Sequence, residues 1–295
     1  MNYIERFAAT GKTGTSERPD WPLAVVIGAG GMGMAVARRL SQRHRILIAD
    51  IDGVRVGTAA SNLRSEGGDA TPIKCDVTSP AEVAALSNKV KELGGFRTLA
   101  HVAGLSPSAS DFTTIVRVNL TGPALVAEAL LPLASTSAAA ILIASLAAHG
   151  FTPSKEVAAV LAEPTHPDLP NRLAALSGTG QATPQRAYQL SKYGLVAYAR
   201  RAARTWAERG ARIVSVSPGL IATPMGAVEF ERSPSKHQML ARTPLQREGT
   251  MLEIADAVEF LASDRASFIS GIDLLVDGGL ASVLFDQTPL ADRGT

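Results

Sequence analysis

Cysteine is almost absent from this chain of 295 residues, because Cys75 stands alone. A single cysteine cannot form an internal disulfide, which excludes a disulfide-stabilised scaffold and favours a reducing, cytoplasmic compartment. The chain also has no large excess of charge of one sign, because its 29 Lys and Arg residues and 27 Asp and Glu residues give a net charge of +2. This balance argues against nucleic acid as a partner, which would require a clustered basic surface.

Long hydrophobic runs and metal-binding spacings are missing as well. The longest apolar run, from Ala138 to Ala148, is too short to cross a bilayer as a helix, and the N-terminus has no apolar signal core. We therefore expect no membrane partner. The five histidines are not spaced with Cys or carboxylates as metal ligands are, so we expect no metal site.

The chain does contain enough apolar residues, 46% of the total, for a sizeable core. At about 150 residues per domain the length allows two domains, but from Leu23 onward short apolar strands alternate with helices in one continuous series. This alternation predicts an α/β fold: a single Rossmann-type, doubly wound parallel sheet of about seven strands with helices on both faces. The expected strands are 23–27, 45–49, 71–74, 98–102, 140–144, 212–216 and 272–276, and the expected helices are 32–40, 81–93, 115–133, 187–209 and 252–261.

The domain boundaries follow from the same series. We expect a polar N-terminal tail over 1–20, the sheet domain over 21–281 and a C-terminal tail over 282–295. Residues 151–186 interrupt the alternation with five prolines around short helical stretches at 154–162 and 171–176. This segment is predicted to be an insertion, and long insertions in such domains often form lids or contact surfaces.

Gly28 to Gly33 fit the pattern G-x-G-x-x-G between an expected strand and an expected helix, which is the context of a dinucleotide-binding loop. The helix N-terminus would offer N–H groups to a pyrophosphate. Asp50, at the end of the second strand, can accept hydrogen bonds from ribose hydroxyls and would repel a 2′-phosphate. Since the loop holds no Lys or Arg, the sequence predicts NAD(H) rather than NADP(H). The alternative interpretation is that these glycines merely form a tight turn and that Asp50 is a solvent-exposed residue at the end of a strand.

Tyr188 and Lys192 form the pattern Y-x-x-x-K in the expected helix 187–209. Their i,i+4 spacing places the phenol and the ammonium on one face, where a nearby cation favours the phenolate. Such a pattern alone is often a surface pair. Here it follows Ser145, which ends an apolar strand, and Asn119, which lies in the expected helix 115–133.

Together these motifs resemble the short-chain dehydrogenase/reductase family from about residue 23 to 281. The resemblance implies that Tyr188 exchanges a proton with the substrate oxygen, Ser145 holds that oxygen, and Lys192 assists Tyr188 and binds the nicotinamide ribose. It implies that Asn119 bends its helix and holds a water of a proton relay. The implied cofactor-binding residues are Gly28, Gly30, Gly31, Met32, Gly33, Asp50, Ile51, Asp76, Val77, Ala103, Gly104, Tyr188, Lys192, Pro218, Gly219, Ile221 and Thr223.

The chain departs from the family at two places. Its glycine loop has one residue fewer between the first two glycines than is usual. His101 and Val102 stand where the family has two asparagines before Ala103 and Gly104, and we expect His101 to be a structural replacement. His149, four residues after Ser145, either lines the pocket or is structural.

The pattern is similar to the 3α-hydroxysteroid dehydrogenase/carbonyl reductase branch of the family. This similarity implies an NAD(H)-dependent oxidoreductase that interconverts a secondary alcohol and a ketone on an apolar, alicyclic or steroid-like substrate. It also implies a homodimer or homotetramer, whose interface the insertion at 151–186 would alter. Two alternatives stay open: a 3-oxoacyl-thioester reductase with the same catalytic residues, and a non-catalytic dinucleotide-sensing protein.

Overall fold

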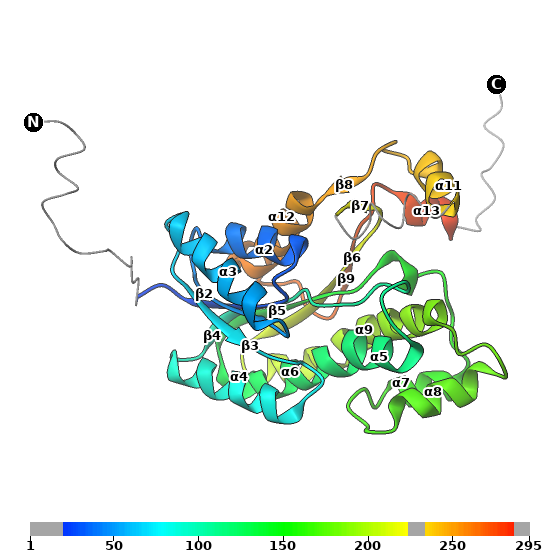
Figure 1. Cartoon of the computed structure of the whole chain (residues 1–295), viewed down its shortest axis with the longest axis horizontal. Helices are drawn as coiled ribbons and strands as arrows, with labels where there is room; N and C mark the ends of the chain where they lie inside the picture. Colours follow the sequence, from blue (N-terminus) through cyan, green and yellow to red (C-terminus); the bar gives the residue numbers. More distant parts are fainter. Residues whose placement is uncertain (1–19, 224–233, 286–295) are drawn as a thin grey trace, which may run out of the picture.

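A seven-stranded parallel sheet forms the centre of the computed structural model, which describes residues 20–223 and 234–285 (Figure 1). The strand order is β3-β2-β1-β4-β5-β6-β9. The predicted Rossmann-type α/β fold is therefore confirmed. The order reverses between β1 and β4, and in such sheets ligands bind beside this reversal at the carboxyl ends of the strands. The strands are β1 (Leu23–Ile27), β2 (Arg45–Asp50), β3 (Ala70–Lys74), β4 (Phe96–His101), β5 (Ala134–Ile143), β6 (Arg212–Pro218) and β9 (Asp273–Val276).

Helices cover both faces of the sheet, as Figure 1 shows. One face carries α2 (Gly31–Leu40), α3 (Gly53–Ser65) and α12 (Met251–Ala262), and the other carries α4 (Pro80–Glu92), α6 (Gly122–Leu130) and α9 (Pro184–Ala207). Successive side chains of a strand point to opposite faces. Accordingly Val25 packs in the apolar cluster beneath α4 and α9, and Val26 packs in the cluster beneath α2 and α12.

Helix α9 starts three residues earlier than predicted. Thr183 caps the helix by accepting a hydrogen bond from the backbone N–H of Arg186, and Pro184 occupies the first turn. Proline is tolerated there because its missing N–H would have no partner within the helix. Pro184 thus belongs to α9 rather than to the insertion.

Helix α3 was not predicted from the sequence. Asp52 caps it by accepting from the N–H groups of Val54 and Arg55. The apolar stripe that α3 buries is weak, because two of its four members are alanines and Gly57 interrupts the helical pattern. Its buried residues are Val56, Ala59, Ala60 and Leu63.

The predicted helix 115–133 is a composite. It consists of α5 (Phe112–Val116), a π-helical segment (Arg117–Thr121), α6 and a 3-10 turn (Leu131–Leu133). The stretch Phe112–Leu133 has the length and the mean hydropathy, 1.3, of a membrane-crossing helix. Its apolar residues are used in the core instead, since Ile115, Leu120 and Leu130 are fully buried against the sheet.

The insertion contains the two helices that the sequence predicts, α7 (Lys155–Leu161) and α8 (Leu169–Ser177). It lies along α5 and α9 (Figure 1). A Cβ atom on Gly194 of α9 would lie 3.1 Å from Cδ2 of Leu161, and Arg201 donates a hydrogen bond to the Leu161 carbonyl at 3.1 Å. The insertion therefore covers part of the α9 surface that faces away from the sheet.

Smaller elements extend the carboxyl edge of the sheet and were not predicted. β7 (Ile221–Ala222) and β8 (Gly249–Thr250) pair as a short two-stranded sheet. In the chain, α11 (Pro234–Arg242) lies between these two strands and α13 (Leu280–Leu284) follows β9. Because α13 runs to residue 284, regular structure continues into the expected C-terminal tail, whose remainder lies outside the described residues. The N-terminal tail also lies outside them, apart from its last residue.

Candidate active site

The glycine loop is packed tightly on one side and open on the other. Gly28 has φ = 102°, which side chains rarely adopt, and a Cβ atom there would lie 2.8 Å from the backbone nitrogen of Ala103. A Cβ on Gly33 would lie 1.9 Å from the Gly28 carbonyl oxygen, so α2 contacts the turn directly. A Cβ on Gly30 would meet no heavy atom within 4 Å in the described part of the chain.

The N-terminus of α2 suits an anion. Gly30 is its N-cap and provides no side-chain acceptor, and the first turn holds no acidic residue. The N–H groups of Gly31, Met32 and Gly33 lack partners within the helix, and the helix dipole adds a partial positive charge. The open space beside Gly30 and these N–H groups fit the diphosphate of a dinucleotide.

Asp50 is only 7% exposed, and both of its carboxylate oxygens have partners. One oxygen accepts from the backbone N–H of Ala29 at 2.7 Å, and the other accepts from the N–H of Asp52 at 3.0 Å. Since each oxygen has two lone pairs, further donors can still bind. Ile51, beside it, is 59% exposed and offers an apolar surface for an adenine.

Arg55 is a residue that sequence reasoning missed. Its Nη1 lies 3.4 Å from Oδ1 of Asp50, and its side chain is 52% exposed. It places a cation beside the carboxylate on which the predicted cofactor selectivity rests. The signal was hidden because Arg55 lies in the first turn of α3, a helix that the sequence did not reveal.

Asp76 and Val77 form the turn between β3 and α4. Oδ1 of Asp76 accepts from both the N–H and the hydroxyl of Thr78, at 2.8 and 2.7 Å. Val77 is buried beside Gly122, where a Cβ atom would lie 2.5 Å from Cγ2 of Val77. Both residues thus shape the turn that precedes α4.

Asn119 lies in the π-helical segment and is fully buried. Its Nδ2 donates to the carbonyl of Leu105 at 2.9 Å, and its Oδ1 accepts from the N–H of Leu105 at 2.8 Å. The side chain therefore holds the loop that follows β4, which contains Ala103 and Gly104. Departures from α-helical geometry of this kind are frequent at functional sites.

Lys192 is 5% exposed, and its Nζ donates to the carbonyl of Ile143 at 2.8 Å. Burial lowers the pKa of this ammonium to about 8. The same Nζ lies 5.8 Å from the ring centroid of Tyr188, one turn earlier on α9. A Cβ atom on Gly104 would lie 3.4 Å from it, so the loop after β4 also reaches this ammonium.

Ser145 follows β5 two residues after Ile143. It caps a 3-10 turn (Leu146–Ala148), and its hydroxyl oxygen accepts from the N–H of Ala147 at 3.2 Å. This turn packs against α9. The structure thus brings Ser145, Tyr188 and Lys192 together at the carboxyl end of β5, and Asn119 reaches the same region through the loop after β4.

The segment from Pro218 to Thr223 continues this edge. Gly219 donates to the carbonyl of Val276 at 3.0 Å, and a Cβ on it would lie 2.7 Å from Cα of Asp277. A cavity of about 480 Å³ adjoins the segment. Its lining residues are Leu220, Ile221, Pro244, Leu245, Arg247, Gly249, Glu253, Leu275, Val276, Asp277, Gly278 and Gly279.

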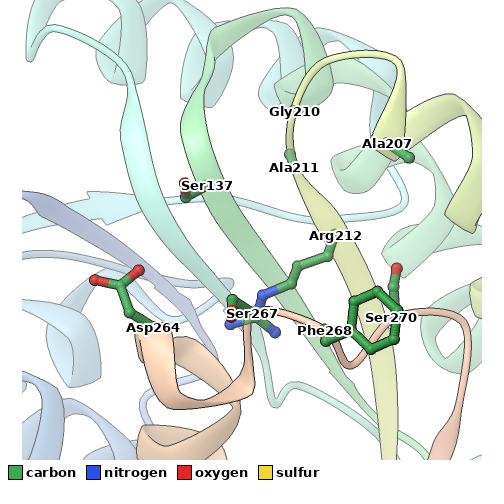
Figure 2. Close-up of a pocket in the computed structure, with 9 residues that line it drawn as sticks. All are labelled: Ser137, Ala207, Gly210, Ala211, Arg212, Asp264, Ser267, Phe268 and Ser270. Atoms are coloured by element: carbon green, nitrogen blue, oxygen red, sulfur yellow. The ribbon is translucent and has the colours of Figure 1, made fainter.

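A second cavity, of about 340 Å³, opens at the opposite, amino-terminal edge of the sheet (Figure 2). Arg212 lines it, but this side chain is 7% exposed and donates to the carbonyls of Leu261 and Ser263 at the C-terminus of α12. The guanidinium therefore stabilises the end of a helix. None of the predicted site residues lines this cavity.

The histidines beside the site differ in their surroundings. Nε2 of His149 lies 2.9 Å from Oδ2 of Asp273, whose side chain is 1% exposed, so His149 is attached to the edge strand β9. This pair joins residues far apart in the sequence and was not predicted. His101 is 1% exposed, and burial together with the charge of Lys192 lowers its pKa to about 3. Residues 20–223 and 234–285 contain no cluster of three or more metal-ligating side chains.

Two family models match the chain. The model described as short chain dehydrogenase matches residues 22–159, and the model described as enoyl-(acyl carrier protein) reductase matches residues 172–281. The two matches lie on either side of the centre of the insertion.

Curated relatives match along nearly their whole length. The short-chain dehydrogenase/reductase bsc3 of Alternaria brassicicola is 31% identical, over 90% of this chain and 97% of the relative. The cis-4-hydroxycyclohexanecarboxylate dehydrogenase of Sinomonas cyclohexanicum is also 31% identical, over 88% and 97%. The 2,5-dichloro-2,5-cyclohexadiene-1,4-diol dehydrogenase LinX of Sphingobium indicum is 27% identical, over 85% and 92%.

Solved structures share the fold. The crystal structure of gox2181 is 27% identical with a TM-score of 0.71, covering 88% of this chain and 96% of that one. An actinorhodin polyketide ketoreductase variant solved with NADPH is 25% identical with a TM-score of 0.71, covering 90% and 98%.

Proposed function

The chain belongs to the short-chain dehydrogenase/reductase family, and on that premise we propose that it interconverts a secondary alcohol and a ketone with NAD(H). The observation that carries this proposal is the meeting of Ser145, Tyr188 and Lys192 at the carboxyl end of β5, with the ammonium buried. The family acts with a nicotinamide dinucleotide, and the open side of the glycine loop fits its diphosphate.

Each catalytic group has a distinct task in this proposal. Tyr188 gives a proton to the carbonyl oxygen during reduction and takes it back during oxidation. The hydroxyl of Ser145 donates a hydrogen bond to the same oxygen, where negative charge develops. The Lys192 ammonium favours the phenolate of Tyr188, and burial strengthens this effect because the local dielectric is low. When bound, the nicotinamide supplies or accepts the hydride.

Asn119 acts on the shape of the site. Because both atoms of its side-chain amide bond to Leu105, it fixes the loop that carries Ala103 and Gly104 against the ammonium of Lys192. We assign it the role of holding this wall of the site, and a water of the proton relay would bind to its backbone rather than to its side chain.

The proposal of NAD(H) over NADP(H) rests on Asp50. Two backbone N–H groups hold its carboxylate in place, where it can accept from ribose hydroxyls and repel a 2′-phosphate. Arg55 acts in the opposite direction, because its cation offsets part of the charge of Asp50. We expect the selectivity for NAD(H) to be moderate for this reason.

An apolar alicyclic or steroid-like substrate is supported by two observations. Two of the relatives are named as dehydrogenases of cyclohexane or cyclohexadiene compounds. In this chain the residues around the carboxyl edge form an apolar cluster of Leu146, Leu220 and Leu280, with Met239 and Leu240 packed against it.

A panel of ketones tests the function directly. NADH oxidation is followed with alicyclic ketones, a steroid ketone and a 3-oxoacyl thioester, and the proposal predicts the highest kcat/KM for an alicyclic or steroid ketone. A preference for the thioester would establish the alternative, a 3-oxoacyl-thioester reductase. Intact NADH binding without turnover on any ketone would instead identify a non-catalytic dinucleotide-sensing protein.

We further propose that the enzyme acts in the cytoplasm on a small molecule and assembles as a homodimer or homotetramer. The single buried thiol, Cys75, suits a reducing compartment. Because the insertion covers part of the outer surface of α9, that surface is less available to a second copy, which favours the dimer.

A further inference from the structure

A buried carboxylate on the edge strand β9 binds the end of the turn that follows Ser145. The side chain of Asp273 is only 1% exposed, and both of its oxygens have partners. Oδ1 accepts from the hydroxyl of Ser215, and Oδ2 lies 2.9 Å from Nε2 of His149. A carboxylate only accepts, so the proton of this last bond belongs to Nε2. A buried carboxylate is costly without such donors, which makes the bond to His149 important for both groups.

Strand β6 leaves room for the imidazole on the α9 side of the sheet. In the parallel register Asp273 lies beside Ser215. Val216 packs in the apolar cluster beneath α2 and α12, so its neighbours Ser215 and Ser217 face the side of α9. Oγ of Ser217 lies 3.4 Å from the same Nε2. These small side chains allow His149 to cross β6 and reach β9.

The turn from Ser145 to His149 is bonded at each residue. The carbonyl of Ser145 accepts from the N–H of Ala148 at 2.9 Å, and the carbonyl of Leu146 accepts from the N–H of His149 at 3.0 Å. The hydroxyl oxygen of Ser145 accepts from the N–H of Ala147 at 3.2 Å. That bond uses a lone pair and leaves the O–H able to donate to a substrate oxygen. The position of the turn therefore sets the direction of this hydroxyl.

The other contacts of the turn are less directional than the bond to β9. Leu146 packs in the apolar cluster that contains Leu220, and apolar contacts have no preferred direction. Gln189 of α9 donates to the carbonyl of Gly150 at 3.4 Å, which is long for a hydrogen bond. The short bond to the buried carboxylate of Asp273 is therefore the contact that fixes one orientation of the turn.

From these contacts we propose that His149 is a positioning residue that acts through Ser145. Bonded to Asp273, it fixes the turn so that the Ser145 hydroxyl is directed at the reacting oxygen of the substrate. The proposal rests on the proposed function only where turnover is the readout. A displacement of a catalytic group by about 1 Å can lower a rate by about 100-fold, so a bond four residues away from Ser145 affects catalysis without contacting the substrate.

The test compares two substitutions at one position. His149→Leu removes the donor, and His149→Gln restores one because its amide nitrogen lies near the place of Nε2. We expect kcat for ketone reduction to fall at least about tenfold in His149→Leu, with the wild-type Kd for NADH, and to recover in His149→Gln. His166→Leu, at an exposed histidine of the insertion, should keep the wild-type kcat. An unchanged kcat in His149→Leu overturns the proposal, as does an equal loss in His149→Leu and His149→Gln.

Hydrogen exchange of residues 145–150, read by mass spectrometry, follows the turn without turnover. Exchange should be faster in His149→Leu than in the wild type and should return to the wild-type rate in His149→Gln. Wild-type exchange in His149→Leu contradicts the proposal even if no ketone is turned over, so its failure is distinct from failure of the proposed function. If thermal unfolding shows that His149→Leu does not fold, His149→Leu/Asp273→Asn replaces it, because this variant also removes the buried charge.

Discussion

Burial determines the chemistry of the individual residues around this site. Lys192 and His101 are both nearly inaccessible, and in both cases burial lowers the pKa. The same cause acts on Cys75 in the other direction, since burial raises the pKa of its thiol to about 11. Burial thus favours the uncharged form of all three groups: a neutral imidazole for His101, an ammonium whose pKa lies near physiological pH for Lys192, and an unreactive thiol for Cys75.

Cys75 should be unreactive in the folded protein. Raising the pKa from 9.0 to about 11 decreases the thiolate fraction at pH 8 by about 100-fold, and the thiolate is the reactive species. The rate of reaction with a disulfide reagent such as DTNB should therefore be at least about 100-fold lower in the native protein than in denaturant. Equal rates in the two states would mean that Cys75 is accessible.

Asp50 and Arg55 should change the cofactor preference in opposite directions. Asp50→Asn removes the negative charge and retains one oxygen that can accept from a backbone N–H group, so the preference for NADH over NADPH in kcat/KM should fall about tenfold or more. Arg55→Ala removes the opposing cation and should increase the preference. A wild-type enzyme that prefers NADPH would contradict the proposed cofactor, whatever the two variants do.

Among the elements, the strands could be predicted because they are short, continuous apolar runs, and the long helices because their apolar residues repeat with the helical period. Leu23 to Ile27 and Arg212 to Val216 are examples, and both lie in the central sheet. Helix α3 could not be predicted, since its buried face includes small alanines. The family resemblance implies that Asn119 bends its helix, but the bonds between Asn119 and Leu105 could not be predicted, because tertiary packing creates them.

The close contact between α2 and the glycine loop can be tested by substituting alanine for Gly33, with the same substitution at Gly57 of α3 as the control. Gly33→Ala would place a methyl group 1.9 Å from the Gly28 carbonyl, and the resulting backbone shift should destabilise the protein by about 1–3 kcal/mol and weaken NADH binding. Gly57→Ala, in α3, meets no heavy atom within 4 Å in the described regions and should stabilise by about 0.5–1 kcal/mol.

Urea unfolding of both glycine variants measures this difference. If Gly33→Ala were as stable as Gly57→Ala, and bound NADH with the wild-type Kd, the close contact between α2 and the glycine loop would have no energetic importance.

In the molecule as a whole, the catalytic groups come from segments far apart in the sequence, and the sheet brings these segments together at the carboxyl ends of its strands. The identities of Ser145, Tyr188 and Lys192 as candidates could be predicted from motifs. Their partners could not: the Ile143 carbonyl on Lys192, Arg55 beside Asp50 and Asp273 beside His149 depend on the register of strands and the packing of helices. Sequence spacing carries no information about such contacts.

The insertion should control assembly. Replacing residues 151–183 with a short Gly/Ser linker would expose the surface of α9 around Gly194 that Leu161 now covers, so a larger oligomer should form, as measured by light scattering. Arg172→Ala is the control, because it removes only an exposed ion pair with Glu163 and should leave the mass unchanged. An unchanged mass for the deletion variant refutes this role of the insertion.

The central proposal is that Tyr188 is the proton donor for hydride transfer to a ketone, and deuteride transfer tests it most directly. With NADH deuterated at C4 and the best ketone of the panel, the wild-type protein should place deuterium on the carbinol carbon. Tyr188→Phe should lower this rate by about 10²–10⁴-fold with an unchanged Kd for NADH, whereas Tyr193→Phe, on the same helix but packed against Phe151, should keep it. A Tyr188→Phe variant that transfers deuteride at nearly the wild-type rate would contradict the proposed mechanism.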